Sequence, residues 1–168
     1  MKECSLIETE RLAIRHLLVE DVSKIFLMSQ EEGMKKWLPD QVYENEEVAH
    51  EVVEFLISQY LEKASPDKAP YVLGVVIKEI KELIGHVGLS PIDEGVEIGY
   101  AIEERYQGKG YATEAVKAMS AWALKELEVS NIWGIVDINN TISARVLEKS
   151  GYSFVKDSGN KNKYMIEA

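Results

Sequence analysis

The sequence predicts one mixed α/β domain, and three observations lead to this. Its 168 residues, 46% of them hydrophobic and 29% charged, are enough for one continuous core and few for two. The spacing of apolar residues is helical over residues 46–63 and strand-like over residues 71–102. From residue 95 onward, strand and helix patterns alternate. We therefore expect an α/β (α+β) domain that covers residues 1–168 without a linker or repeat.

The N-terminal part is predicted to contain one strand and two helices. Residues 9–16 have the pattern of a strand, and Asp21 can cap a short helix that follows it. In residues 46–63 the apolar side chains recur at helical spacing, with Asn45 as a candidate cap. Residues 36–43, which contain two aromatic side chains, are expected to form the loop between the helices.

The middle of the chain predicts three neighbouring strands. Residues 71–77 are almost continuously apolar and β-branched, and residues 83–89 and 95–102 alternate. Short polar turns join them, so they are expected to form an antiparallel meander. Beyond them, the patterns predict further elements in the order helix, strand, helix and two terminal strands, at 111–127, 132–136, 141–149 and from 152 onward.

Charge and composition limit the classes of function. A formal net charge of -10 argues against nucleic-acid binding, which needs clustered basic residues, and fits a cationic substrate better. The apolar runs are far shorter than the roughly 20 residues of a membrane span, and no N-terminal signal pattern is visible, so a cytoplasmic location is expected. The single cysteine, Cys4, predicts a free thiol, and three scattered histidines predict no metal site.

A glycine turn is the strongest local signal. Gly108-Lys-Gly110 lies between a predicted strand and a predicted helix, where glycines let several backbone N–H groups point at one spot beside a helix start. Such a turn can bind a phosphate or pyrophosphate, and it can also be an ordinary tight turn.

Three kinds of phosphate site can be compared with this turn. A Walker loop fails, because Tyr111 stands where Ser or Thr is needed. A dinucleotide site, and with it an oxidoreductase, fits the strand–turn–helix–strand order followed by Asp137. Against it, Thr113 replaces the third glycine, and five residues separate Ile102 from Gly108. The third kind is a loop for the pyrophosphate of coenzyme A.

For that third kind, the segment Arg105-Tyr-Gln-Gly108-Lys-Gly110 resembles the coenzyme A loop of the GNAT acetyltransferase superfamily. Thr9-Glu-Arg-Leu-Ala-Ile-Arg15 is similar to the start of its ribosomal-protein N-terminal acetyltransferase branch. Further segments follow in the order of that branch: Ile84-Gly85, Glu97-Ile-Gly-Tyr100, Gly110-Tyr-Ala-Thr-Glu-Ala115, Asn140-Thr-Ile-Ser143 and Glu148-Lys-Ser-Gly-Tyr152. The resemblance covers nearly the whole chain.

The resemblance implies a single-domain GNAT fold, with a twisted mixed β-sheet flanked by about four helices, that transfers acetyl from acetyl-CoA to a primary amine without a metal. The acceptor would be a protein N-terminal amine or a small-molecule amine, and the protein a monomer or homodimer. A non-catalytic coenzyme A-binding regulator stays an alternative. The expected coenzyme-binding residues are Ile98, Gly99, Tyr100, Ala101, Ile102, Arg105, Tyr106, Gln107, Gly108, Lys109, Gly110, Tyr111, Ala112, Asn140, Ser143 and Arg145.

Two side chains are candidates for the chemistry. Alternation in residues 95–102 puts Glu97 on the face of the small residues Gly99 and Ala101, where it can accept a proton from an amine through water. It can equally be a charged residue on a solvated face. Ser143 matches the serine of the branch and can hydrogen-bond the leaving thiolate, or simply cap the helix start.

The remaining residues to consider are a leucine on the second C-terminal helix, two aromatic side chains and a histidine. Many relatives carry a tyrosine at the position of Leu147, which therefore departs from their pattern. Trp37 and Tyr43 can line the acceptor pocket or pack the early loop against the helices. His86 is expected to be structural.

Overall fold

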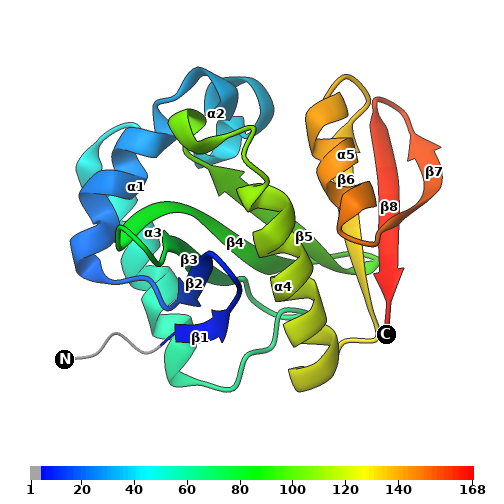
Figure 1. Ribbon diagram of the computed structural model, residues 1–168, viewed down its shortest axis with the longest axis horizontal. Coiled ribbons are helices and arrows are strands. Elements are labelled where there is room, and N and C mark those ends of the chain that lie inside the picture. The colour runs from blue at the N-terminus through cyan, green and yellow to red at the C-terminus, as the bar shows by residue number, and fades with distance from the viewer. Residues whose placement is uncertain (1–4) are drawn as a thin grey trace.

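The computed structural model describes residues 5–168, which form one mixed sheet of eight strands in the order β1-β2-β3-β4-β5-β6-β8-β7 (Figure 1). The strands are β1 (Ser5–Glu8), β2 (Leu12–Arg15), β3 (Tyr71–Ile77), β4 (Glu82–Ile92), β5 (Gly95–Ile102), β6 (Asn131–Asp137), β7 (Ser153–Ser158) and β8 (Lys161–Glu167). The α-helices are α1 (Val22–Ser29), α2 (Glu32–Trp37), α3 (Glu46–Ser58), α4 (Tyr111–Glu126) and α5 (Thr141–Lys149). Cys4 lies outside the described residues.

The N-terminus corrects the single strand predicted over 9–16. Two antiparallel strands, β1 and β2, are joined by a turn in which the Thr9 N–H donates to the Leu12 carbonyl at 2.9 Å. Thr9 and Arg11 therefore belong to a turn, and only Leu12–Arg15 keeps the predicted strand. The alternation of Leu12 and Ile14 is too short to show where the chain reverses.

Asp21 occupies the N-cap position of α1 but does not cap it with its side chain. Its carboxylate instead accepts two hydrogen bonds from the Arg15 guanidinium, at 2.8 and 3.1 Å, and one from the Leu18 N–H at 2.8 Å. Both side chains are nearly inaccessible. The predicted cap is thus half of a buried ion pair that ties β2 to the start of α1.

The segment predicted as a loop over 36–43 contains the end of a helix. Helix α2 covers Glu32–Trp37, and a 3-10 turn at Pro39–Gln41 follows it. Asn45 does cap α3, because its Oδ1 accepts from the Val48 N–H at 3.0 Å. Helix α3 ends at Ser58, earlier than predicted, and continues as a 3-10 turn.

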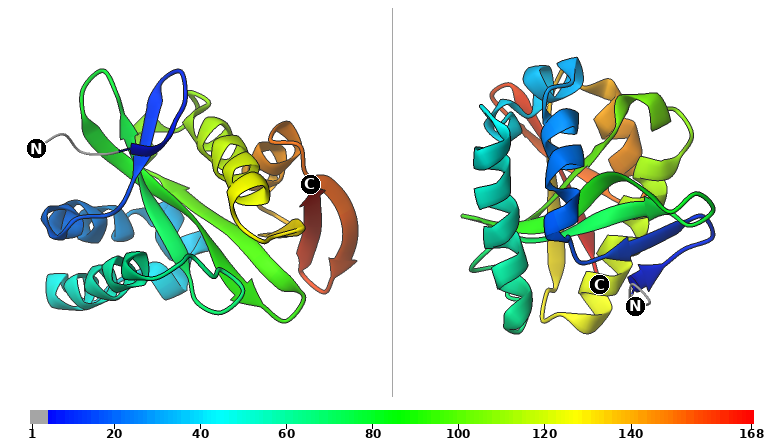
Figure 2. Two further views of the ribbon diagram at one scale, coloured as in Figure 1. Left: turned by 90° about the horizontal axis from the view of Figure 1, so that it is seen from below. Right: turned by 90° about the vertical axis from the view of Figure 1, so that its left-hand side faces the viewer.

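The predicted meander is confirmed, and its alternation creates two cores. Strands β3, β4 and β5 pair antiparallel in sequence order. One face, with Leu73 and Ile98, packs against α4 and α5, and the other, with Val76 and Leu83, packs against α1 and α3. Figure 2 shows α1 and α3 on the side of the sheet opposite α4.

Strands β5 and β6 diverge, and this divergence creates the site. They are parallel, and among the described residues Glu97 opposite Trp133 is their one paired position. In the antiparallel pairing of β5 with β4, alternate residues of β5 direct their backbone N–H and C=O groups to β4, and the residues between them direct theirs to the other edge of β5. The edge of β5 beyond Glu97 therefore faces a gap rather than a strand.

The C-terminal elements follow the predicted order, with β8 placed between β6 and β7. Antiparallel pairing joins β6 to β8 along its length, from Asn131 opposite Glu167 to Asp137 opposite Lys161. Within residues 5–168, no helix is long and apolar enough to cross a membrane.

Candidate active site

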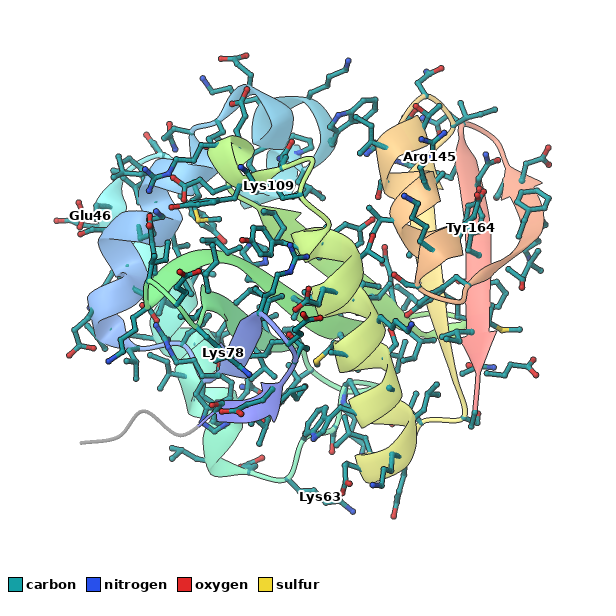
Figure 3. The ribbon with its side chains drawn as sticks, viewed as in Figure 1. Glu46, Lys63, Lys78, Lys109, Arg145 and Tyr164 are labelled. Carbon is teal, nitrogen blue, oxygen red and sulfur yellow. The ribbon has the colours of Figure 1, made fainter. Side chains whose placement is uncertain are left out.

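A cleft of about 750 Å³ occupies the gap between β5 and β6. Its walls come from α2, β5, the loop before α4, the first turn of α4, the end of β6 and α5. Figure 3 shows Lys109 and Arg145 on the two segments that border this gap, the loop before α4 and helix α5. The cleft therefore connects the glycine loop with both faces of β5.

The two faces of β5 give the cleft two different sides. Ile98 and Tyr100 point toward α4 and α5, so Glu97 and Gly99 point to the face that α1 and α3 cover. A Cβ added to Gly99 would meet nothing within 4 Å. Gly99 thus leaves open space in the middle of the strand beside Glu97.

The glycine loop adopts backbone angles that require glycine. Gly108 has φ +77° and Gly110 has φ +84°, and a Cβ at Gly108 would project into open space. Gly110 is the N-cap of α4, and the first N–H groups of a helix have no partner within it. The loop and the helix start together offer backbone donors to an anion at the cleft wall.

The N-terminal hairpin holds this loop in place. Arg11 donates to the Lys109 carbonyl at 2.9 Å and to Glu114 Oε1 at 2.8 Å, and the Thr9 hydroxyl donates to Glu114 Oε2. In a trans peptide the carbonyl and the next N–H point in opposite directions. The Gly110 N–H therefore points away from Arg11. The segment from Thr9 to Arg11 thus has a structural role, which is to hold the glycine loop and the start of α4 through hydrogen bonds.

Glu97 is partly buried, and burial raises the pKa of its carboxyl. Lys161 and Lys163 act in the opposite direction, and Glu94 adds to the rise in pKa. Glu97 and Lys161 both line the cleft. A carboxylate with a raised pKa is better matched to accept a proton near neutral pH than an ordinary one.

Ser143 does not cap α5, because Asn140 does: its Oδ1 accepts from the Ser143 N–H at 3.2 Å. The Ser143 hydroxyl instead contacts the Tyr100 hydroxyl, which also donates to the Ser143 carbonyl at 3.2 Å. The Ser143 side chain therefore does not cap the helix, which was the structural alternative to a role in the reaction. Leu147, one turn further along α5, is buried and offers no polar group.

The structure gathers most predicted site residues in the cleft lining. These are Trp37, Glu97, Ile98, Gly99, Tyr100, Ala101, Ile102, Tyr106, Gln107, Gly108, Gly110, Tyr111, Ala112, Asn140, Ser143 and Arg145. Arg105, Lys109 and Tyr43 lie outside it. Arg105 forms ion pairs with Glu82 and, at 2.8 Å, with Glu103, whereas Tyr43 packs against the core between α1 and α3.

Several lining residues were not predicted. Glu31 accepts the Glu104 N–H through both carboxylate oxygens, at 3.1 and 3.2 Å, and burial raises its pKa. Met34, on α2, also lines the cleft. Glu31 lies 73 residues from Glu104 in the sequence, so no local pattern could have joined them. His86 lies outside the lining, and burial lowers its pKa to about 4.

With this geometry established, the sequence profile of the acetyltransferase (GNAT) domain matches residues 11–153. The chain belongs to the GNAT acetyltransferase family. It is 27% identical over 147 residues to the uncharacterized N-acetyltransferase YnaD of Bacillus subtilis (strain 168), covering 86% of this chain and 81% of that one. Family membership makes the protein an N-acetyltransferase of the GNAT family rather than a dinucleotide-dependent oxidoreductase.

Solved GNAT structures share the fold. An acetyltransferase (GNAT family) from Bacillus anthracis superposes with a TM-score of 0.78 at 26% identity, covering 96% of this chain and 97% of that one. RimL, a ribosomal L7/L12 alpha-N-protein acetyltransferase solved with coenzyme A, superposes with a TM-score of 0.78 at 15% identity, covering 95% of both chains. Within residues 5–168, no group of three His, Cys, Asp or Glu side chains is placed to hold a metal ion.

Proposed function

We propose that this GNAT enzyme transfers the acetyl group of acetyl-CoA directly to a primary amine, and that it belongs to the ribosomal-protein N-terminal acetyltransferase branch. The observation that carries the proposal is the cleft between β5 and β6, which joins the glycine loop to Glu97. An anion site and a partly buried carboxylate thus share one space. The acceptor is a protein N-terminal amine or a small-molecule amine.

The donor side of the cleft suits coenzyme A. The pyrophosphate would lie on the backbone donors from Gly108 to Ala112, at the start of α4. The amide-bearing pantetheine arm would run along the edge of β5 that β6 leaves free, from Ile98 to Ile102. Arg145 lines the same side and adds positive charge near the phosphates.

The acceptor side suits a cationic amine. Glu31, Glu97 and Trp37 all line the cleft. The Lys36 ammonium lies 4.6 Å from the centre of the Trp37 ring, so this ring would offer an acceptor its other face or its edge. The carboxylates would attract an ammonium ion into the cleft, and their partial burial would strengthen their field. Gly99 leaves room for the acceptor next to Glu97.

The reaction balances with these groups. Glu97 accepts one proton from the ammonium through water, and the neutral nitrogen attacks the thioester carbon. The C–N bond forms, the C–S bond breaks, and sulfur keeps the electron pair, stabilised by a hydrogen bond from Ser143. The nitrogen's second proton goes to solvent, and the thiolate takes up a proton on release. No protein nucleophile takes part.

An amine panel tests this function. Peptides with different N-terminal residues, polyamines and aminoglycosides are each incubated with acetyl-CoA, and free coenzyme A thiol is measured. We expect thiol release with at least one class, together with a rise in melting temperature on adding acetyl-CoA. Binding of acetyl-CoA without thiol release for any amine, or stabilisation by NAD alone, would contradict the proposal.

A further inference from the structure

The hydroxyl of Tyr100 reaches across the gap between β5 and α5 to Ser143. It contacts the Ser143 Oγ and lies 3.2 Å from the Ser143 carbonyl oxygen. Alternation in β5 produces this placement, because Tyr100 shares the face of Ile98 and Ile102 that looks toward α4 and α5. Both residues line the cleft.

The phenol has one hydrogen and two acceptors within reach. Burial raises the pKa of Tyr100, so the phenol stays protonated through the neutral range. When its hydrogen is donated to the Ser143 carbonyl, the phenol oxygen accepts from the Ser143 O–H; in a second arrangement, the phenol donates to the Ser143 Oγ. In the second arrangement the Ser143 oxygen is occupied as an acceptor, and its own hydrogen is free to point into the cleft.

We propose that Tyr100 is a positioning residue for the transfer: its hydroxyl orients the Ser143 hydroxyl so that the serine hydrogen points at the thiolate that leaves. The inference rests on the proposed function, and it assigns to the Tyr100 side chain a role that its backbone position does not imply. In this role the Tyr100 side chain touches neither substrate and acts through Ser143.

A phenol is suited to this task because it is a stronger hydrogen-bond donor than an aliphatic hydroxyl. As the C–S bond breaks and charge grows on sulfur, Ser143 donates to sulfur, and a donor behind Ser143 polarises its O–H further. The hydrogen of Tyr100 then sits on the Oγ rather than on the carbonyl. Only hydrogen bonds change, and neither hydroxyl loses its proton.

Two single variants and their combination test the pairing. Tyr100→Phe keeps the ring and removes the hydroxyl, and Ser143→Ala removes the proposed donor. We expect Tyr100→Phe to lower kcat about tenfold, near the upper end of what one hydrogen bond between neutral groups contributes, with an unchanged Kd for acetyl-CoA. Since Tyr100 acts through Ser143, the double variant should have the kcat of Ser143→Ala.

Tyr152→Phe is a matched control. The Tyr152 hydroxyl also bonds a serine, Ser120, at 2.7 Å, but both residues are buried away from the cleft lining. This variant loses a comparable tyrosine–serine hydrogen bond and should lower the melting temperature while keeping kcat. If it lowered kcat as much as Tyr100→Phe, the effect of Tyr100 would be one of stability, and the inference would be wrong.

The remaining outcomes separate the inference from the proposed function. A wild-type enzyme that releases no thiol with any amine overturns both. An active enzyme in which Tyr100→Phe has normal kcat, or in which the two effects multiply in the double variant, keeps the proposed function and overturns the inference alone. A normal kcat for Ser143→Ala overturns the inference and also removes Ser143 from the proposed reaction, while acetyl transfer itself stands.

Discussion

The side chain of Leu147 lies directly over Gly134, where β6 has left β5. A Cβ built on Gly134 would come within 2.7 Å of Leu147 Cδ1 and 2.8 Å of Cδ2. Leu147 is 1% exposed and belongs to the core beneath α5. Gly134 therefore lets α5 sit close to the sheet, and Leu147 serves packing at this position.

Gly134→Ala should destabilise the fold. The added methyl has no free space, so the leucine or α5 must move, at a cost of about 1–3 kcal/mol in the free energy of unfolding. Urea denaturation monitored by circular dichroism measures this. Gly99→Ala is the control, because its Cβ meets nothing within 4 Å: it should unfold like wild type but raise the KM for the amine. Equal stability of Gly134→Ala and wild type would refute the packing argument.

Gly108→Val should weaken binding of acetyl-CoA. A side chain there would project into the space that the pyrophosphate needs, and φ +77° is unfavourable for valine. Gly159→Val carries the same kind of strain, with φ +66°, in the turn between β7 and β8. Calorimetric titration should show a loss of affinity for Gly108→Val alone, although both variants lose stability. An unaltered Kd at Gly108 would count against the loop assignment.

Glu97→Gln should lower kcat about 10²- to 10⁴-fold, the usual contribution of a general base. In the wild type the base must be deprotonated, so kcat/KM falls as pH falls through its pKa. Burial raises that pKa, so the fall begins at a higher pH than for an exposed carboxyl. The acidic limb attributable to Glu97 should be missing in Glu97→Gln, as pH–rate profiles at saturating acetyl-CoA would show.

Glu94→Gln is the companion variant. Glu94 pairs with Lys163 at 2.9 Å and raises the pKa of Glu97. Its removal should move the acidic limb to lower pH and leave the maximal rate nearly unchanged. If the acidic limb of the pH–rate profile kept its midpoint in both variants, it would come from the titration of another group, and Glu97 would have no part in proton transfer.

Asp21→Asn should reduce stability by about 3–5 kcal/mol, because it removes the carboxylate from a buried guanidinium. Arg15 and Asp21 are joined by two hydrogen bonds and are about one-tenth exposed. Glu8→Gln is the contrast: Glu8 is 3.8 Å from Lys78 on the surface, and its loss should cost under about 1 kcal/mol. Similar melting temperatures for the two variants would show that burial does not decide the effect.

Long periodic segments made most of the fold predictable. The strands β3, β4 and β5 and the long helix α4 have apolar residues at regular spacing, and this spacing identifies the face of each element that is buried. The hairpin of β1 and β2 and the short helix α2 were missed because each is only four to six residues long. Asp21 was misassigned because its partner, Arg15, is on a different element.

The site was predictable where backbone conformation demands a residue type. Positive φ angles favour glycine, so the turn could be predicted from Gly108 and Gly110 in the sequence. The alternation of residues in β5 placed Glu97 and Gly99 on one face. Arg105 was expected near phosphates because its charge is visible, but the Glu82 carboxylate that binds it comes from β4. Contacts between side chains of distant elements, such as Tyr100 with Ser143, depend on how β5 and β6 diverge.

The divergence of β5 from β6 also has a kinetic consequence. In the proposed arrangement, coenzyme A would occupy the side of the cleft formed by α4 and α5, and the amine the side formed by α2, so both substrates could be bound together. Direct transfer would then take place while both are bound. Initial-velocity plots should therefore intersect, as for a ternary complex, and no acetylated form of the protein should accumulate without an acceptor.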